Sequence, residues 1–134
     1  GSYAVTNSKQ FVAYCFAPVA GFSAMGSYVG NGSSNGAFIY TGFRPAYIMV
    51  KAATGGSSNS QNWLVEDSAR SPYNQVSVNL APNSANAEES GYNQADFLSN
   101  GFKMRSAYER SNENGTTYIY MAFAENPFKY ALAR

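Results

Sequence analysis

Short apolar runs, cut by Gly, Asn, Ser and Pro, recur along the whole chain, and within them hydrophobic side chains tend to alternate with smaller or polar ones. A period of two is typical of β-strands, and Val, Ile, Tyr and Phe favour that conformation. No window shows the long amphipathic pattern of a capped helix. The pattern predicts strands over residues 10–17, 22–29, 37–41, 46–52, 62–66, 75–80, 95–98, 101–105 and 116–124.

The dipeptide Asn-Gly occurs four times, at residues 31–32, 35–36, 100–101 and 114–115. It tolerates the positive φ angles of tight hairpin turns and is therefore a strong hairpin signal. Short strands joined by such turns predict an all-β domain, an antiparallel two-sheet β-sandwich. The run 47–51 is the most apolar, and we expect it to be a central strand. Trp63 lies in the middle of the strand 62–66, and we expect it in the core.

Residues 11–17, Phe-Val-Ala-Tyr-Cys-Phe-Ala, resemble residues 118–124, Tyr-Ile-Tyr-Met-Ala-Phe-Ala. Two interpretations are open. The two strands occupy equivalent, neighbouring places in one core, or the first is the end of a preceding copy of the same domain. The spacing is too large for a solenoid repeat.

A chain of 134 residues has the size of one domain with its own core. We interpret residues 1–2, Gly-Ser, as a cloning scar and residues 3–134 as a single domain. Only 13% of the residues are charged and the net charge is +1, against about 25% charged residues in a typical domain. Nucleic-acid binding needs a strongly basic face and is not expected. The apolar runs are too short for membrane insertion.

The chain contains no histidine. This excludes a Ser-His-Asp triad, a Cys-His pair and a His-ligated metal within it. The single cysteine, Cys15, permits no internal disulfide, and we expect it to be a small buried hydrophobe.

Carboxylates are sparse. Glu66 and Asp67 are adjacent, so a strand would direct them to opposite faces, which does not make the facing pair of a glycosidase. Asp67 and Asp96 are the only aspartates, and no calcium-loop pattern is present. We expect no enzyme activity, cofactor or metal, with a calcium site built from loop carbonyls left open. The spacing Asp-x-x-Arg instead predicts a structural ion pair between Asp67 and Arg70, with ligand binding as its alternative.

Tyrosines occur in three expected loops, and in two of these loops they stand next to side-chain amides. Tyrosine has a flat apolar face with a hydroxyl, and amides both donate and accept hydrogen bonds, which suits neutral sugars as well as protein surfaces. Alternatively, these tyrosines cover the edges of the sheets. The candidate ligand-binding residues are Tyr73, Asn74, Tyr92, Asn93 and Tyr108.

Six segments in a fixed order resemble one protein family. They are residues 26–32 (Gly-Ser-Tyr-Val-Gly-Asn-Gly), 40–46 (Tyr-Thr-Gly-Phe-Arg-Pro-Ala), 67–70 (Asp-Ser-Ala-Arg), 82–84 (Pro-Asn-Ser), 96–103 (Asp-Phe-Leu-Ser-Asn-Gly-Phe-Lys) and 117–128 (Thr-Tyr-Ile-Tyr-Met-Ala-Phe-Ala-Glu-Asn-Pro-Phe). In this order they resemble the C-terminal domains of tail-fibre and related structural proteins of marine and environmental bacteriophages. The resemblance covers residues 12–134 and implies a jelly-roll sandwich of the concanavalin/laminin-G type. It carries over no catalytic or ligand residue.

The resemblance implies a virion protein that is extracellular during host attachment. The expected function is non-catalytic attachment to a host cell-surface glycan or protein, with avidity from multiple copies of the fibre. The alternative is a purely structural domain that decorates or assembles a fibre with other virion proteins and has no ligand of its own. A depolymerising enzyme is disfavoured. Homo-oligomerisation is left open.

Overall fold

The computed structural model describes residues 10, 12–55, 62–91 and 94–127. All regular elements in this part of the chain are strands. They are β1 (Ser23–Val29), β2 (Phe38–Tyr40), β3 (Pro45–Thr54), β4 (Leu64–Asp67), β5 (Asn79–Leu80), β6 (Ala95–Leu98), β7 (Gly101–Met104) and β8 (Thr117–Ala124). A membrane-spanning helix, which needs both length and an apolar sequence, is not found among the described residues.

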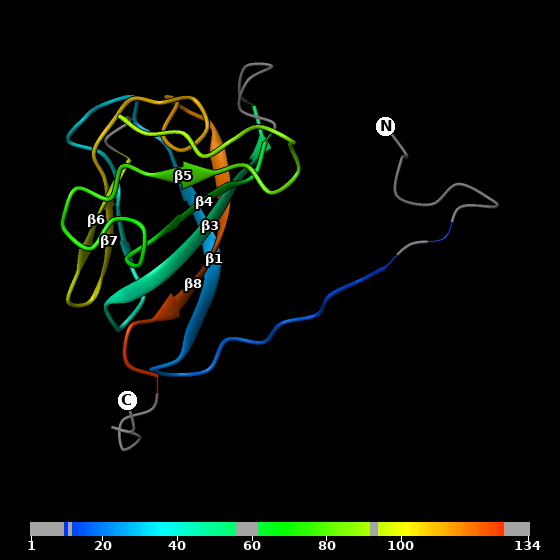
Figure 1. The fold of residues 1–134 in the computed structure, drawn as a ribbon, viewed down its shortest axis with the longest axis vertical. Helices are drawn as coiled ribbons and strands as arrows, with labels where there is room; N and C mark the ends of the chain where they lie inside the picture. Colours follow the sequence, from blue (N-terminus) through cyan, green and yellow to red (C-terminus); the bar gives the residue numbers. More distant parts are fainter. Residues whose placement is uncertain (1–9, 11, 56–61, 92–93, 128–134) are drawn as a thin grey trace.

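The strands form two antiparallel sheets (Figure 1). The larger sheet has the order β1-β8-β3-β4-β5 and the smaller sheet has the order β2-β7-β6. The apolar strand β3 is the middle strand of the larger sheet, as the sequence predicts. Strand β8 pairs along its length with both β1 and β3, so strands from the two ends of the described chain lie side by side.

One core joins the two sheets, because each sheet buries alternate side chains against the other. The larger sheet contributes Ile48 and Val50 from β3 and Tyr118 and Ala122 from β8. The smaller sheet contributes Ile39, Phe97, Phe102 and Met104. All of these side chains are 5% exposed or less. The predicted all-β architecture with two antiparallel sheets is therefore confirmed.

Two of the four Asn-Gly dipeptides illustrate different uses of glycine. Gly115 has a φ of 78° in the turn before β8, as the hairpin signal predicts. Gly101 instead begins β7 and pairs with Leu98, so the β6–β7 turn is formed by the two residues before it. A Cβ at residue 101 would clash with the carbonyl oxygen of Ile39. Glycine is required there because β2 passes very close.

Three sequence predictions about the N-terminal segment and β5 are wrong. Residues 12–17, which we call the N-terminal arm, do not form a strand within the described chain, although residues 10–17 are predicted to. The backbone of the arm diverges from the sheets ahead of β1 and joins neither of them (Figure 1). Its Cys15 is therefore exposed rather than buried. Of the strand predicted over residues 75–80, only the last two residues form β5, because Val76 makes an isolated bridge to Ala95 of the other sheet instead.

Candidate functional site

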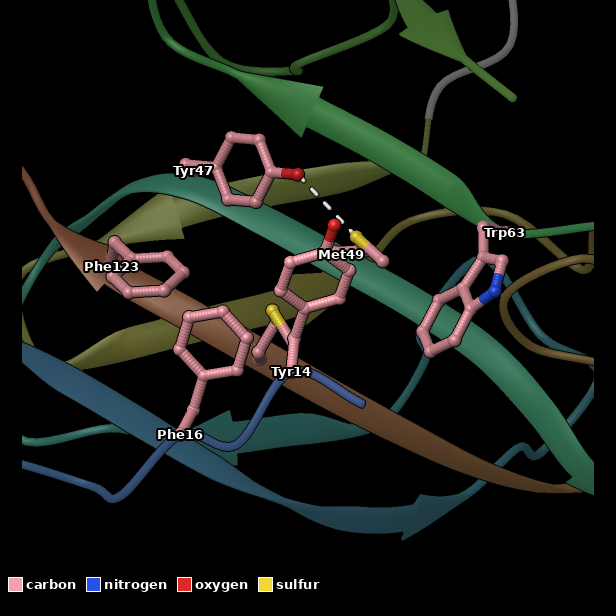
Figure 2. A pocket seen from close by; sticks show the side chains of 7 residues that line it. Tyr14, Phe16, Tyr47, Met49, Trp63 and Phe123 are labelled. Atoms are coloured by element: carbon pink, nitrogen blue, oxygen red, sulfur yellow. Dashed lines mark hydrogen bonds between the residues drawn. The ribbon is translucent and has the colours of Figure 1, made fainter. Parts of the chain in front are cut away.

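A groove with a volume of about 720 Å³ lies on the outer face of the larger sheet, the face turned away from the core (Figure 2). We call it the aromatic groove. Five of its seven lining residues come from the sheet and the loop before β4, and two come from the N-terminal arm. They are Tyr47, Met49, Trp63, Met121, Phe123, Tyr14 and Phe16.

The groove exists because β3 and β8 are apolar on both faces. Along β3, Ile48 and Val50 point into the core, so Met49 between them must point outward. Along β8, Met121 stands outward for the same reason. The register pairs Met49 with Met121, which places the two thioether side chains next to each other on the groove floor. Both are half-buried.

Phe123 is the centre of an aromatic cluster at one end of the groove. Its ring meets those of Tyr47 and Phe22 nearly edge-on, each with the centroids 5.9 Å apart. The ring of Phe16 meets it in the same way from the arm, at 6.4 Å. Edge-to-face contacts of this kind stabilise a fixed arrangement of rings. This end of the groove is therefore preformed.

Trp63 lines the other end and is held by the loops around it. Its backbone N–H donates to Oδ1 of Asn83 at 2.9 Å, and the amide of Asn83 donates in turn to Oδ1 of Asn62 at 2.8 Å. The ammonium group of Lys51 lies 5.3 Å from the centre of the indole ring, a cation–π contact. The expectation that Trp63 lies in the core is wrong. Leu64 pairs with the core residue Val50, so the residue before it belongs to the outer face, where Trp63 lines the groove.

The described lining of the groove carries no charged side chain. Its polar atoms are the hydroxyls of Tyr14 and Tyr47 and the indole N–H of Trp63. Burial raises the pKa of Tyr47, although the positive charge of Arg70 opposes the shift. The hydroxyl therefore stays protonated at neutral pH, and it donates to Sδ of Met49 at 3.5 Å. A surface of rings and thioethers with so few polar atoms suits contact with another apolar surface.

The predicted ion pair between Asp67 and Arg70 is present beside this face. The guanidinium Nε lies 2.6 Å from Oδ2 of Asp67, and a second guanidinium nitrogen also contacts this oxygen. Oδ1 accepts the backbone N–H groups of Ala69 and Arg70. Partial burial acts to raise the pKa of Asp67, but the hydrogen bonds and charge of Arg70 outweigh it and lower the pKa. The pair fixes the turn after β4.

The predicted loop residues do not line the aromatic groove where the structure describes them. Tyr73 is 83% exposed. The side-chain amide of Asn74 donates to the carbonyl oxygen of Phe97 at 3.0 Å and accepts from its N–H at 2.9 Å. Asn74 thus acts as an additional partner of β6, and its ligand-binding role stays a prediction.

Tyr108 lies in another loop and is only partly exposed. The guanidinium group of Arg110 covers its ring at 5.5 Å and pairs with Glu89 at 3.0 Å. Tyr92 and Asn93, which are also predicted to bind a ligand, lie outside the described residues. No group of three or more Asp, Glu, Cys or His side chains comes together for a metal ion in the part of the chain that the structure describes.

Sequence reasoning missed the groove residues because a strand that is apolar on both faces does not show which face another layer covers. A signal was nevertheless present. Tyr47, Met49 and Lys51 alternate with the core residues of β3 and so share its outer face, and Trp63 lies on the same face next to them.

Comparison with known proteins places the chain in a family. No curated protein and no solved structure matches it. One family model matches residues 1–127, which include the N-terminal arm and both sheets, and its description is "Domain of unknown function (DUF7483)". Because this match covers nearly the whole chain, the protein belongs to the DUF7483 family.

Proposed function

We propose that this protein is a non-catalytic attachment domain of the phage tail-fibre type, and that the aromatic groove is its contact surface. The observation that carries the proposal is a groove lined by aromatic rings and methionines on the outside of a sheet, with one end fixed by ring contacts. Monomeric proteins rarely expose such a contiguous apolar patch without a binding role.

The chemistry of the groove favours a protein target over a glycan. Recognition of a sugar requires several hydrogen-bond donors and acceptors around the aromatic platform, whereas the described groove has two hydroxyls and one indole N–H. Methionine side chains adapt to irregular apolar surfaces, and aromatic residues with methionine are enriched in the cores of protein interfaces. We therefore propose an apolar segment of a protein on the host surface as the target.

The rest of the proposal follows from the resemblance to tail-fibre domains. The two sheets would form a jelly-roll sandwich of the concanavalin/laminin-G type, and the protein would act on the virion, outside the host cell. Its sparse charge supports a contact that does not depend on ionic attraction.

The proposal is tested by binding of the fluorescently labelled protein to a panel of intact bacterial cells. Saturable binding is expected to one or more of them. The variant Trp63→Ala should lose it, because the ring is an anchor at one end of the groove. Its matched control is Tyr40→Ala, which removes an aromatic side chain that is 68% exposed and lies outside the groove. Circular dichroism should show that both variants remain folded.

The identity of the target is decided by treating the cells before binding. Protease treatment should abolish binding if the target is a protein. Loss of binding after periodate oxidation alone would show a glycan target and overturn the protein assignment. Equal binding by the wild type and Trp63→Ala would show that the groove is not part of the contact surface.

The second candidate function is a structural role in fibre assembly, and the exposed apolar arm favours it. Val12 and Tyr14 are 79% and 82% exposed, which is unusual for side chains without a partner. No binding to any cell in the panel, together with stable co-assembly with another virion protein, would favour this role over attachment.

A further inference from the structure

Residues 11–17 align without a gap with residues 118–124 of β8. Phe16 and Ala17 have identical counterparts in Phe123 and Ala124. Val12 corresponds to Ile119, another β-branched residue. The arm therefore carries the sequence of a β8 strand, which in this fold is paired on both sides.

The structure excludes the first of the two interpretations, in which both strands share one core. No backbone–backbone hydrogen bond joins residues 12–17 to another described residue, and neither sheet contains them. A strand-like apolar segment without a ladder exposes its backbone groups and its side chains together, an arrangement that folded domains avoid. The arm therefore has a strand-like sequence but no neighbouring strands to pair with among the described residues.

The side chains of the arm also point the way a β8 strand would direct them. In β8, Met121 and Phe123 face the outer side, while Tyr120 and Ala122 face the core. The alignment makes Tyr14 and Phe16 the outer-face positions of the arm. These are the two arm residues that line the aromatic groove, as Figure 2 shows. The face that the alignment assigns to Tyr14 and Phe16 is therefore the face to which the structure directs them.

Addition of the arm to this sheet as a sixth strand beside β1 does not fit. Val19 and Ser23 form an antiparallel bridge that would begin such a hairpin. Continuing its register would place Phe16 opposite Gly26, on the core side of β1. The structure places Phe16 on the outer side instead, and the preceding hairpin position, Pro18, has no N–H to donate.

We infer that the N-terminal arm forms the β8-equivalent strand of a second copy of this fold, which precedes this one in the polypeptide. The outer-face residues of that strand then meet the outer face of this copy, so the aromatic groove is the cleft at the junction between adjacent copies. Ligand pockets often form at such domain junctions. The inference concerns chain organisation and does not depend on the proposed ligand.

Cys15 provides the test, because it is the only cysteine and corresponds to Ala122, which is fully buried. In the 134-residue protein Cys15 is exposed, so a thiol reagent should label it at the rate of a free thiol. A tandem polypeptide in which residues 18–117 precede residues 11–134 gives the arm a complete set of sheet partners. There the labelling of Cys15 should slow by about tenfold or more.

A tandem without the arm, in which residues 18–117 precede residues 18–134, is the matched control. Its first copy lacks a β8 strand and should remain unfolded. The tandem with the arm should therefore show more protected amides and a steeper dependence of the unfolding free energy on urea. Equal amide protection in the two tandems, with Cys15 labelled as fast as in the single protein, would count against the inference.

One more variant makes the arm more similar to β8, because the first copy in this tandem has a core shaped for the side chains of β8. Tyr118 donates its hydroxyl to the carbonyl oxygen of Glu109 at 2.6 Å, and the sequence has Phe11, just before the arm, at that position. Ala13 likewise replaces the ring of Tyr120. The double substitution Phe11→Tyr/Ala13→Tyr restores both side chains in the tandem. Free labelling of Cys15 in this tandem as well would overturn the inference.

Two neighbouring positions of the arm test which of its side chains face the core of the preceding copy. In the tandem, Ala13→Glu places a charge on the core side and should abolish the protection of Cys15, whereas Val12→Glu on the outer side should preserve it. In the single protein neither substitution should change the stability, since the arm is unpaired there. Loss of protection with Val12→Glu alone would contradict the inferred facing.

Discussion

Glu66 and Asn79 lie opposite each other on β4 and β5, and both side chains are fully buried. Neither the carboxyl group nor the amide has a hydrogen-bond partner among the described residues. Complete burial raises the pKa of Glu66 well above its usual value, and the positive charge of Arg70 only partly opposes this. Folding therefore favours the neutral carboxyl group.

This pair makes the stability of the protein depend on pH. Because the pKa of Glu66 is higher in the folded state, its contribution is fully present below the unfolded value of 4.5 and is lost as the pH rises through the folded pKa. The substitution Glu66→Gln should remove this loss and raise the free energy of unfolding at alkaline pH by about 1 kcal/mol or more. Urea unfolding at several pH values measures it.

The control is Glu88→Gln, which changes an exposed carboxylate. Its stability should follow that of the wild type at every pH. If the curves of Glu66→Gln and the wild type stayed parallel, Glu66 would not be the group responsible.

Asn112 should be one of the most sensitive polar residues. It is fully buried, its amide nitrogen lies within hydrogen-bonding distance of Oδ1 of Asn31 and of two backbone carbonyl oxygens, and its Oδ1 accepts the N–H of Asn31. The substitution Asn112→Ala leaves these groups unpaired and should lower the free energy of unfolding by about 3 kcal/mol. Urea denaturation provides the measurement.

Asn86→Ala is the matched control because Asn86 is exposed. Its stability should lie within about 0.5 kcal/mol of the wild type. A similarly small effect at Asn112 would show that the loops around it do not depend on its amide.

The Asp67–Arg70 pair should stabilise the protein at neutral pH and not in acid. Since Arg70 lowers the pKa of Asp67 in the folded state, the contribution is present above the unfolded value of 3.8 and disappears as the pH falls through the folded pKa. Asp67→Asn should cost about 1 kcal/mol at neutral pH, and its stability should converge with that of the wild type in acid. Thermal unfolding as a function of pH tests this.

The exposed pair of Arg44 and Glu125 serves for comparison. Glu125→Gln should have little effect at any pH, because screening weakens exposed ion pairs. A gap between Asp67→Asn and the wild type that persisted in acid would point to lost hydrogen bonds rather than lost charge.

Binding through the aromatic groove should change little with ionic strength. The described lining holds no charged side chain, so few charges are available for salt to screen. The affinity for cells that bind the protein should stay nearly constant between about 0.1 M and about 1 M salt. A steep decrease would instead indicate a charged contact surface elsewhere on the protein.

Alternation was enough to predict most of the strands. The apolar run of β3 is the middle of the larger sheet, and the hairpin of β6 and β7 lies where its short apolar segments and turn predict it. Local chemistry was also enough for the ion pair of Asp67 and Arg70, because both partners lie within one turn. Such features depend on residues that are close in the sequence.

The faces of the strands depended on the other sheet and on distant segments. Trp63 and Glu66 are three residues apart, yet the tryptophan lines an outer groove and the carboxyl group of Glu66 is buried on the core side, opposite Ile48. Period-two patterning separates the two sides of a strand but does not name the covered side. That choice follows from packing against residues far away in the chain, such as Phe102 of β7. The arm shows the same limit, since its strand-like sequence finds no partner within the described part of this chain.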